Sequence, residues 1–182
     1  PTMGALHDGH ISLITRAREE ADIVIASIFV NPTQFGEGED LDAYPRPIQQ
    51  DKDKLGTAGC DALWHPDAAT MYPQGFQTTI SLDHITQPLE GAHRPGHFDG
   101  VATVVAKLFG QVTPDIAIFG QKDYQQLMLI KQMVADLNIP VSVIGAPTLR
   151  DENGLALSSR NAYLNQDQYH IAVTLNKTLQ EA

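Results

Sequence analysis

The sequence has a single cysteine, Cys60, among its 182 residues. One thiol forms no disulfide within the chain, which is typical of a protein in a reducing compartment such as the cytoplasm. Paired cysteines at the spacing of a zinc site are absent as well. We therefore interpret Cys60 as a small side chain of the core, and we expect no metal site built on cysteine.

Long apolar runs and positive charge are also scarce. No run approaches the roughly 20 apolar residues of a membrane-spanning helix. The chain has 12 Lys and Arg against 22 Asp and Glu, a formal net charge of −10. Most of such a surface repels a nucleic-acid backbone. We expect neither a membrane nor a nucleic acid as a partner, and an anionic ligand would need a few local positive groups.

Apolar, β-branched runs alternate with segments of helical periodicity along most of the chain. Buried strands are predicted at residues 22–30, 115–119 and 140–144, with shorter strands at 62–64 and 77–82. Helices are predicted at about 9–20, 47–57, between 97 and 113, from 120 to about 137, and from about 167 onward. Such βαβ units build a parallel sheet with helices on both faces. The predicted fold class is α/β, a Rossmann-like, doubly wound parallel sheet.

A turn-rich segment near residues 147–153 indicates a domain boundary. We expect residues 1–149 to form the main domain and residues 150–182 to be the start of a small second domain. The chain opens with Pro1 rather than Met and closes within a predicted helix. We interpret it as a fragment of a longer protein, incomplete at its N-terminus.

Residues 1–10, PTMGALHDGH, form a turn that runs directly into the first predicted helix. His7 and His10 share one face of that helix, and the free N–H groups at a helix start attract phosphate. Gly9 between them would let a flat group lie against the backbone. The pattern favours a nucleotide-phosphate site, but a helix cap with two surface histidines, or half of a metal site, stays open.

Ligands of open parallel sheets bind outside the carboxyl ends of the strands, so residues that follow the strands are candidates for one site. Three polar clusters fit this rule, at residues 31–34, 120–123 and 158–160. Together with His7 and His10 they should converge on one edge of the sheet. That convergence is stronger evidence for a binding site than any cluster alone.

Each cluster also has a simpler interpretation. Lys122 could meet a phosphate at a strand-to-helix turn, or only pair with Asp123 in solvent. Asn31 and Gln34 could hold a hydroxyl or carboxylate, or only shape a turn. Further weak candidates are Ser158, Ser159 and Arg160 as a phosphate clamp, and Arg94 and His97 before a helix. The carboxylates Glu39, Asp40, Asp42, Asp51 and Asp53 are interpreted as a solvated loop and helix face, and the alternative is that one of them assists a magnesium ion.

Five motifs resemble the pantothenate synthetase family, in the same order and at familiar separations. They are PTMGALHDGH at 1–10, SIFVNPTQF at 27–35, RPGHF at 94–98, FGQKDYQQ at 119–126 and LALSSRN at 155–161. The family is part of the nucleotidylyl-transferase superfamily, whose HxGH-type signature would be residues 7–10 here. Family members carry a first strand before the opening motif and a longer C-terminal domain, and this chain departs from them in both respects.

The resemblance implies a role for each matching residue. Catalytic roles in adenylation fall to His7, His10, Lys122 and Arg160. Contacts with ATP are implied for Met3, Gly4, His10, Gly120, Lys122, Asp123, Ser158, Ser159 and Arg160, with Asp123 on the ribose. Pantoate would be held by Gln34 and Gln126, and the substrate site would also be lined by Met3, Asn31, Arg94 and His97. No protein ligand for a metal ion is implied.

The implied reaction has two steps. Pantoate and ATP give pantoyl adenylate and pyrophosphate, and β-alanine then displaces AMP to give pantothenate. The pantoate carboxylate is already ionised at neutral pH, so the first step needs no general base. It does need charge neutralisation and in-line placement of the reacting groups. The resemblance also implies Mg²⁺ on the leaving phosphates and a homodimer, and the sequence names no base for the β-alanine amine.

Three other hypotheses compete with this ligase. The first is a nucleotide-binding fragment or module without turnover, which would bind ATP and stop. Another is a different nucleotidylyl transferase, but a neutral pocket with Gln34 and Gln126 suits pantoate better than a second nucleotide. A metal hydrolase built on His7 and His10 lacks an obvious third ligand.

Overall fold

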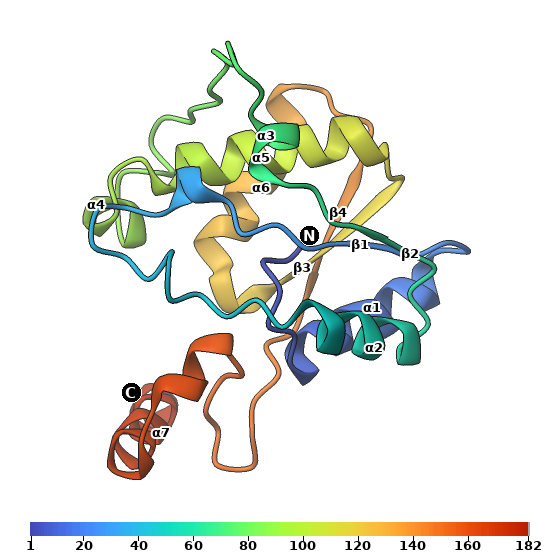
Figure 1. Cartoon of the computed structure of the whole chain (residues 1–182). Coiled ribbons are helices and arrows are strands. Elements are labelled where there is room, and N and C mark those ends of the chain that lie inside the picture. Colours follow the sequence, from blue (N-terminus) through green and yellow to red (C-terminus); the bar gives the residue numbers. More distant parts are fainter. Residues whose placement is uncertain (182) are drawn as a thin grey trace.

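The computed structural model describes residues 1–181 as α-helices, short 3-10 helices and parallel strands (Figure 1). In chain order the elements are α1 (Asp8–Glu20), β1 (Ile25–Ser27), η1 (Pro32–Gln34), α2 (Ile48–Thr57), β2 (Ala62–Trp64), α3 (Ala68–Met71), α4 (Glu90–His93), α5 (His97–Val112), β3 (Ile116–Gly120), η2 (Gln121–Asp123), α6 (Tyr124–Asp136), β4 (Ser142–Ala146), η3 (Ser159–Tyr163) and α7 (Gln166–Glu181). The predicted α/β class is confirmed.

The strands form two parallel pairs. β1 pairs with β2, with Ile25 opposite Ala62, and β3 pairs with β4, with Ile116 opposite Ser142. Among the described residues no ladder joins β1 to β3, although an isolated parallel bridge places Thr2 beside Ile28. A groove of about 310 Å³, lined by residues of both β1 and β3, lies between the two pairs. The predicted parallel sheet is thus present as two parallel pairs separated by this groove.

Helices cover both faces of this arrangement. α1 and α2 lie on one side, where Ile14, Ala26 and Leu55 belong to one buried cluster (Figure 1). α5 and α6 lie on the other, where Val105, Leu127 and their neighbours form the larger cluster. Cys60 packs partly buried against the first cluster, as its small apolar side chain predicts. Both helix layers therefore form by the burial of apolar stripes against strands.

Two predictions about local structure are wrong. Residues 77–82 alternate like a strand, yet they lie extended without a partner strand in the described part of the chain. Their order comes from α5, because Ile80 donates its N–H to the Thr103 hydroxyl at 2.9 Å and Leu82 is buried in the core. The second miss is helical, because no helix was predicted at 68–71 or 90–93, where the short helices α3 and α4 form.

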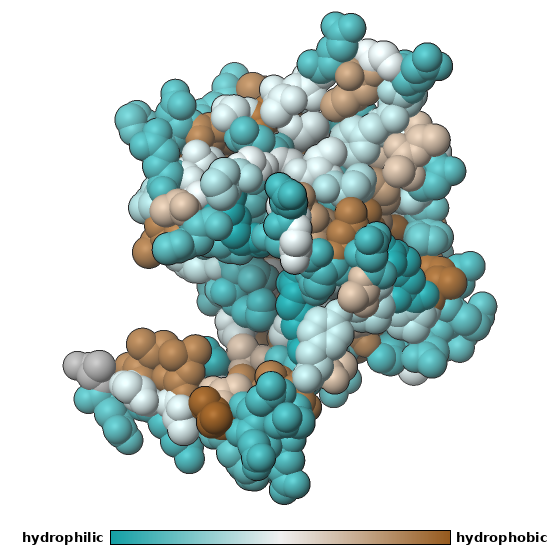
Figure 2. All heavy atoms as spheres, turned by 60° about the vertical axis from the view of Figure 1, so that its left-hand side comes forward, coloured by the Kyte–Doolittle hydropathy of each residue, from teal (hydrophilic) through white to brown (hydrophobic). Residues whose placement is uncertain are grey.

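The C-terminal segment forms an arm beside the main body, at the lower left of Figure 1. Apolar side chains on α7 remain exposed there, with Ile171 at 70% and Leu179 at 69%. Figure 2 shows hydrophobic surface gathered on this arm. Of the helices described for residues 1–181, none combines the length and the apolar character that crossing a membrane requires.

Candidate active site

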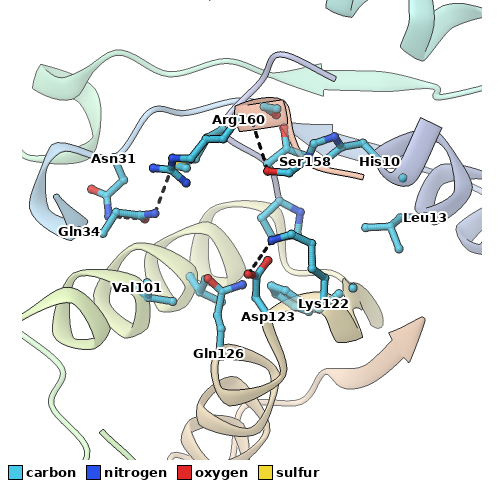
Figure 3. Close-up of a pocket in the computed structure, with 18 of the residues that line it drawn as sticks. His10, Leu13, Asn31, Gln34, Val101, Lys122, Asp123, Gln126, Ser158 and Arg160 are labelled. Atoms are coloured by element: carbon cyan, nitrogen blue, oxygen red, sulfur yellow. Dashed lines mark hydrogen bonds and ion pairs between the residues drawn. The ribbon is translucent and has the colours of Figure 1, made fainter. Parts of the chain in front are cut away.

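A pocket of about 270 Å³ opens where β1 and β3 end, and it joins all the predicted clusters (Figure 3). The residues predicted from sequence that line it are Met3, His7, His10, Asn31, Gln34, Arg94, His97, Gly120, Lys122, Asp123, Gln126, Ser158, Ser159 and Arg160. Gly4 is the exception, because it lies behind the pocket wall against Asp51 and Ile28. The convergence expected from the strand-end rule is therefore present.

His7 and His10 sit at the start of α1, and their δ nitrogens cap that helix. The Nδ1 of His7 accepts the N–H of Gly9 at 3.1 Å, and the Nδ1 of His10 accepts the N–H of His7 at 3.3 Å. An imidazole nitrogen that accepts a backbone N–H carries no proton. Each neutral ring therefore holds its proton on Nε2, which no described residue accepts. The helix-cap interpretation is correct, and the same geometry leaves two N–H donors for a ligand.

Burial keeps both imidazoles neutral at physiological pH. The pKa of His10 is lowered to about 3, chiefly by desolvation and to a smaller extent by His7 and by nearby cations such as Lys122. The pKa of His7 is lowered by burial first and by the charge of Lys122 second. The two rings lie with centroids 4.1 Å apart. They offer neutral hydrogen-bond donors, and the cationic side chains that line the pocket are Arg94, Lys122 and Arg160.

Gly9 is required by the cap itself. A Cβ on this residue would lie 2.8 Å from Cε1 of the His7 ring, which is closer than atoms approach. A side chain here would therefore push the His7 ring out of its capping position. The sequence argument expected Gly9 to admit a ligand, whereas the structure uses the space for the imidazole.

Asp51 is a site-supporting residue that the sequence argument placed wrongly. It was interpreted as part of a solvated face, but it is only 1% exposed. Its carboxylate accepts the N–H of Ala5 at 2.9 Å and the N–H of Leu6 at 2.8 Å. These bonds tie α2 to the loop before α1 and thereby position His7. The sequence did contain a signal for this burial. Asp51 precedes the apolar Leu55 by one helical turn, so both residues lie on the same face of α2, which is the buried face.

The cationic groups of the pocket are paired and partly exposed. The ammonium of Lys122 lies 3.0 Å from Asp123, so the simpler interpretation of this lysine describes the structure as it stands. The guanidinium of Arg160 donates to both carboxylate oxygens of Asp40, at 2.9 and 2.7 Å. This pairing holds the pKa of Asp40 below its usual value. Asp40 was interpreted as solvated, and it is instead the partner of Arg160.

Besides the Arg160–Asp40 pair, a serine hydroxyl ties the C-terminal segment to the pocket. The hydroxyl of Ser159 donates to the carbonyl oxygen of Ala5 at 3.0 Å, across 154 residues of sequence. Ser158 caps the short helix η3 by accepting the N–H of Arg160. Ser158, Ser159 and Arg160 thus reach the pocket from the side opposite Lys122, and Figure 3 shows this opposition.

The far side of the pocket presents amide side chains. Asn31 is 1% exposed, and its Nδ2 donates to Oε1 of Gln34 at 3.1 Å. The Nε2 of Gln34 contacts the sulfur of Met3 at 3.2 Å, a weak acceptor. Gln126 faces this region from α6. The arrangement offers amide groups, without formal charge, to a hydroxyl or carboxylate.

Arg94 and His97 line the pocket, but their polar groups are bound to the protein. Arg94 donates to Glu39 at 2.7 Å and to Glu90 at 2.8 Å, and these carboxylates raise its pKa. The His97 Nδ1 lies 2.7 Å from the carbonyl oxygen of Gln34, which can only accept, so Nδ1 holds the proton. Its Nε2 faces Arg94 at 3.1 Å. These residues shape the wall; Glu39, interpreted as solvated, is part of the same network.

The described residues also bear on metal binding. Within 1–181 no group of three or more His, Cys, Asp or Glu side chains is placed to hold a metal ion. Asp123, the acidic residue among the predicted contacts, is already paired with Lys122.

A family model for pantoate-beta-alanine ligase matches residues 1–182. The pantothenate synthetase of Ectopseudomonas mendocina is 58% identical over 182 residues, which are 99% of this chain and 64% of that protein. The pantothenate synthetase of Rhizorhabdus wittichii is also 58% identical over 182 residues, covering 100% of this chain and 64% of that protein. The chain thus spans about two thirds or slightly less of the length of these relatives.

Solved structures show the same fold. The crystal structure of pantothenate synthetase from Thermus thermophilus has a TM-score of 0.97 and 53% identity, and covers 99% of this chain and 66% of that one. A pantoate-beta-alanine ligase from Francisella tularensis, solved with a β,γ-ATP compound and β-alanine, has a TM-score of 0.94 and 48% identity. That match covers 99% of this chain and 69% of the other.

Proposed function

Because this chain belongs to the pantoate-beta-alanine ligase family, we propose that it catalyses the ATP-dependent condensation of pantoate with β-alanine. The reaction passes through pantoyl adenylate and releases pyrophosphate and AMP. The observation that carries the proposal is the division of one pocket into two sides. Neutral N–H donors, Lys122 and Arg160 lie on one side. Amide side chains lie on the other, beside an Arg94 guanidinium that is paired with Glu39 and Glu90.

The first side suits the triphosphate of ATP. His7 and His10 donate through Nε2–H to phosphate oxygens, while Lys122 and Arg160 leave their carboxylate partners to neutralise charge that develops on the leaving pyrophosphate. The hydroxyls of Ser158 and Ser159 add hydrogen bonds. Asp123, released from Lys122, accepts from the ribose hydroxyls. Gly120 and the backbone near Met3 and Gly4 flank the nucleotide.

The second side suits pantoate. Gln34 and Gln126 bind its oxygen atoms, with Asn31, Met3, Arg94 and His97 shaping the wall. The pantoate carboxylate then attacks the α-phosphorus directly, since it is ionised at neutral pH. Mg²⁺, when present, comes with the phosphates and lowers their charge, because the described protein atoms offer it no cage. We further propose residues 1–149 as the catalytic domain, 150–182 as the start of a lid domain, a homodimer, and a place in the cytoplasm.

The test is pantoate-dependent exchange of labelled pyrophosphate into ATP, without β-alanine. Exchange is expected, because adenylation needs only the two sides of this pocket. Bound ATP with a cooperative melt but no exchange would contradict the proposal for this chain and favour a nucleotide-binding module. Exchange that does not depend on pantoate would point to a different acceptor.

A further inference from the structure

The buried amide of Asn31 is bonded at both of its polar atoms. Its Oδ1 accepts the hydroxyl of Tyr72 at 2.7 Å and the hydroxyl of Thr33 at 3.0 Å. Its Nδ2 donates to the carbonyl oxygen of Gly100 at 3.2 Å and to Oε1 of Gln34 at 3.1 Å. An amide held in this way has one orientation.

The direction of each bond follows from the backbone groups around Asn31. The carbonyl of Gly100 can only accept, so the atom facing it is the Asn31 nitrogen. The Thr33 N–H can only donate, and it points to Oδ1 at 3.4 Å. Since Asn31 therefore donates to Gln34, the oxygen of Gln34 faces Asn31. One N–H of the Gln34 NH2 group meets the weak acceptor Met3 sulfur, and the other N–H is left for a ligand. The helix α5 can approach η1 this closely because Gly100 has no side chain. A Cβ on Gly100 would lie 2.4 Å from the Thr33 carbonyl oxygen.

Tyr72, which follows α3, contacts Asn31 from the side that faces away from the pocket. It does not line the pocket. Burial raises the pKa of its phenol, so the hydroxyl remains a donor at neutral pH. The ring is held edge-on to Phe76 with centroids 5.2 Å apart, and it lies 6.2 Å from the ring of Phe29. A rigid donor therefore points at the oxygen of Asn31.

We propose that Tyr72 is a positioning residue that acts through Asn31 to hold the Gln34 amide with its NH2 toward the ligand. This end of the pocket then selects an oxygen that accepts a hydrogen bond, either a hydroxyl or a carboxylate oxygen. The inference rests on the proposed function in taking pantoate as that ligand. Without the phenol hydroxyl, Asn31 loses its shortest hydrogen bond. The remaining bonds to Gly100 and Thr33 are longer, so they hold Asn31, and through it the Gln34 amide, less firmly.

The test is a double-mutant cycle that combines Tyr72→Phe with Gln34→Ala. The affinities for pantoate and for ATP are measured separately by calorimetry for each protein. Tyr72→Phe keeps the ring and should weaken pantoate about three- to tenfold, the scale of one hydrogen bond, with ATP affinity unchanged. In the Gln34→Ala background the same change should have less than about a twofold effect, because the residue it positions is gone. Equal weakening in both backgrounds would overturn the inference.

Two further measurements separate this inference from its premise. Tyr169→Phe removes a phenol hydroxyl that bonds Asp151 outside the pocket, and both affinities should stay unchanged. The side-chain NH2 signals of Gln34, assigned by their loss in Gln34→Ala, should shift or broaden in ligand-free Tyr72→Phe. Unmoved signals would refute the role of Tyr72 whether or not pantoate binds. Failure of the unchanged chain to bind pantoate would instead refute the proposed function.

Discussion

At the nucleotide side of the pocket, Lys122 and Arg160 are 39% and 46% exposed and pair with carboxylates that are themselves in contact with solvent. At the pantoate side, Asn31 is 1% exposed and is bonded at both polar atoms. Exposed ion pairs contribute about 0–1 kcal/mol and exchange partners easily. A buried, satisfied amide network holds one geometry. The difference teaches that the charged side is arranged to change partners on binding, whereas the neutral side is preorganised.

The origin of the two sides in the chain is different as well. The nucleotide side is assembled from the start of α1, the turn after β3 and the C-terminal segment. That segment is held to the main body by the Ser159 bond to Ala5 and the exposed Arg160–Asp40 pair. The pantoate side is built on η1 and on α5, which pack closely at Gly100. Segments joined by few contacts open at low free-energy cost. Substitutions at the nucleotide side should therefore alter the rate of adenylation and the affinity for ATP. Substitutions at the pantoate side should alter the affinity for pantoate.

The largest effect is expected for Lys122→Ala. Loss of this cation should raise the barrier to adenylation by about 2–4 kcal/mol, because one electrostatic contact to the developing charge disappears. Pyrophosphate exchange measures the effect, and an unchanged melting temperature serves as the control. An unchanged exchange rate in Lys122→Ala would show that Lys122 has no role in adenylation. The proposed difference between the charged side and the amide side of the pocket would then lose one of its supports.

A pH dependence tests whether the nucleotide side relies on neutral imidazoles. The folded pKa of His10 is about 3, below the value of about 6.5 for a free histidine, so acid protonates the unfolded chain first. Stability should therefore fall as pH decreases from about 6.5 toward 3. Between pH 7 and 5 the contribution of His10 is at most about 2 kcal/mol.

Melting curves at pH 7 and 5 measure this contribution. His10→Asn keeps an acceptor for the His7 N–H but cannot titrate in this range, so its stability should change less between the two pH values. Equal slopes for both proteins would show that His10 is not held neutral by burial.

Gln126→Ala should separate the two substrates. Removal of an amide from the pantoate side should weaken pantoate about tenfold, on the scale of a hydrogen bond to a charged or polar ligand, while ATP affinity changes less than about twofold. Calorimetric titration of each substrate measures the two affinities. Parallel losses for pantoate and ATP would indicate a folding defect, and the division of the pocket would not hold.

The smallest effect is expected for Asp40→Asn. Arg160 must leave Asp40 before it contacts a phosphate, and an exposed pair of this kind contributes about 0.2–1 kcal/mol. Its removal should therefore tighten ATP about one- to fivefold and leave pantoate unchanged. Asp42→Asn, a change of equal charge on an exposed residue of the same loop, is the matched control. The same gain in both variants would assign the effect to net charge alone.

Much of this site was predictable because it depends on local patterns and one topological rule. The apolar runs that end at Asn31 and Gly120, and the turn that begins α1 at Asp8, are local features of the sequence. Parallel strands end at one edge, and this rule brings their following residues together. The order of motifs was enough to identify the family, and hence the expected partners of each motif.

Tertiary structure alone decided which polar groups are free to meet a ligand. Arg94 is neutralised by Glu39 across 55 residues, Asp51 anchors Ala5 across 46, and Tyr72 bonds Asn31 across 41. Nothing in the periodicity of a segment encodes such distant pairs, since periodicity reports which face is buried and not what that face meets. The sequence by itself determined the elements, the family and the edge where the site forms. Packing determined the tautomers of the histidines, the partners of the charges and the orientation of the Gln34 amide.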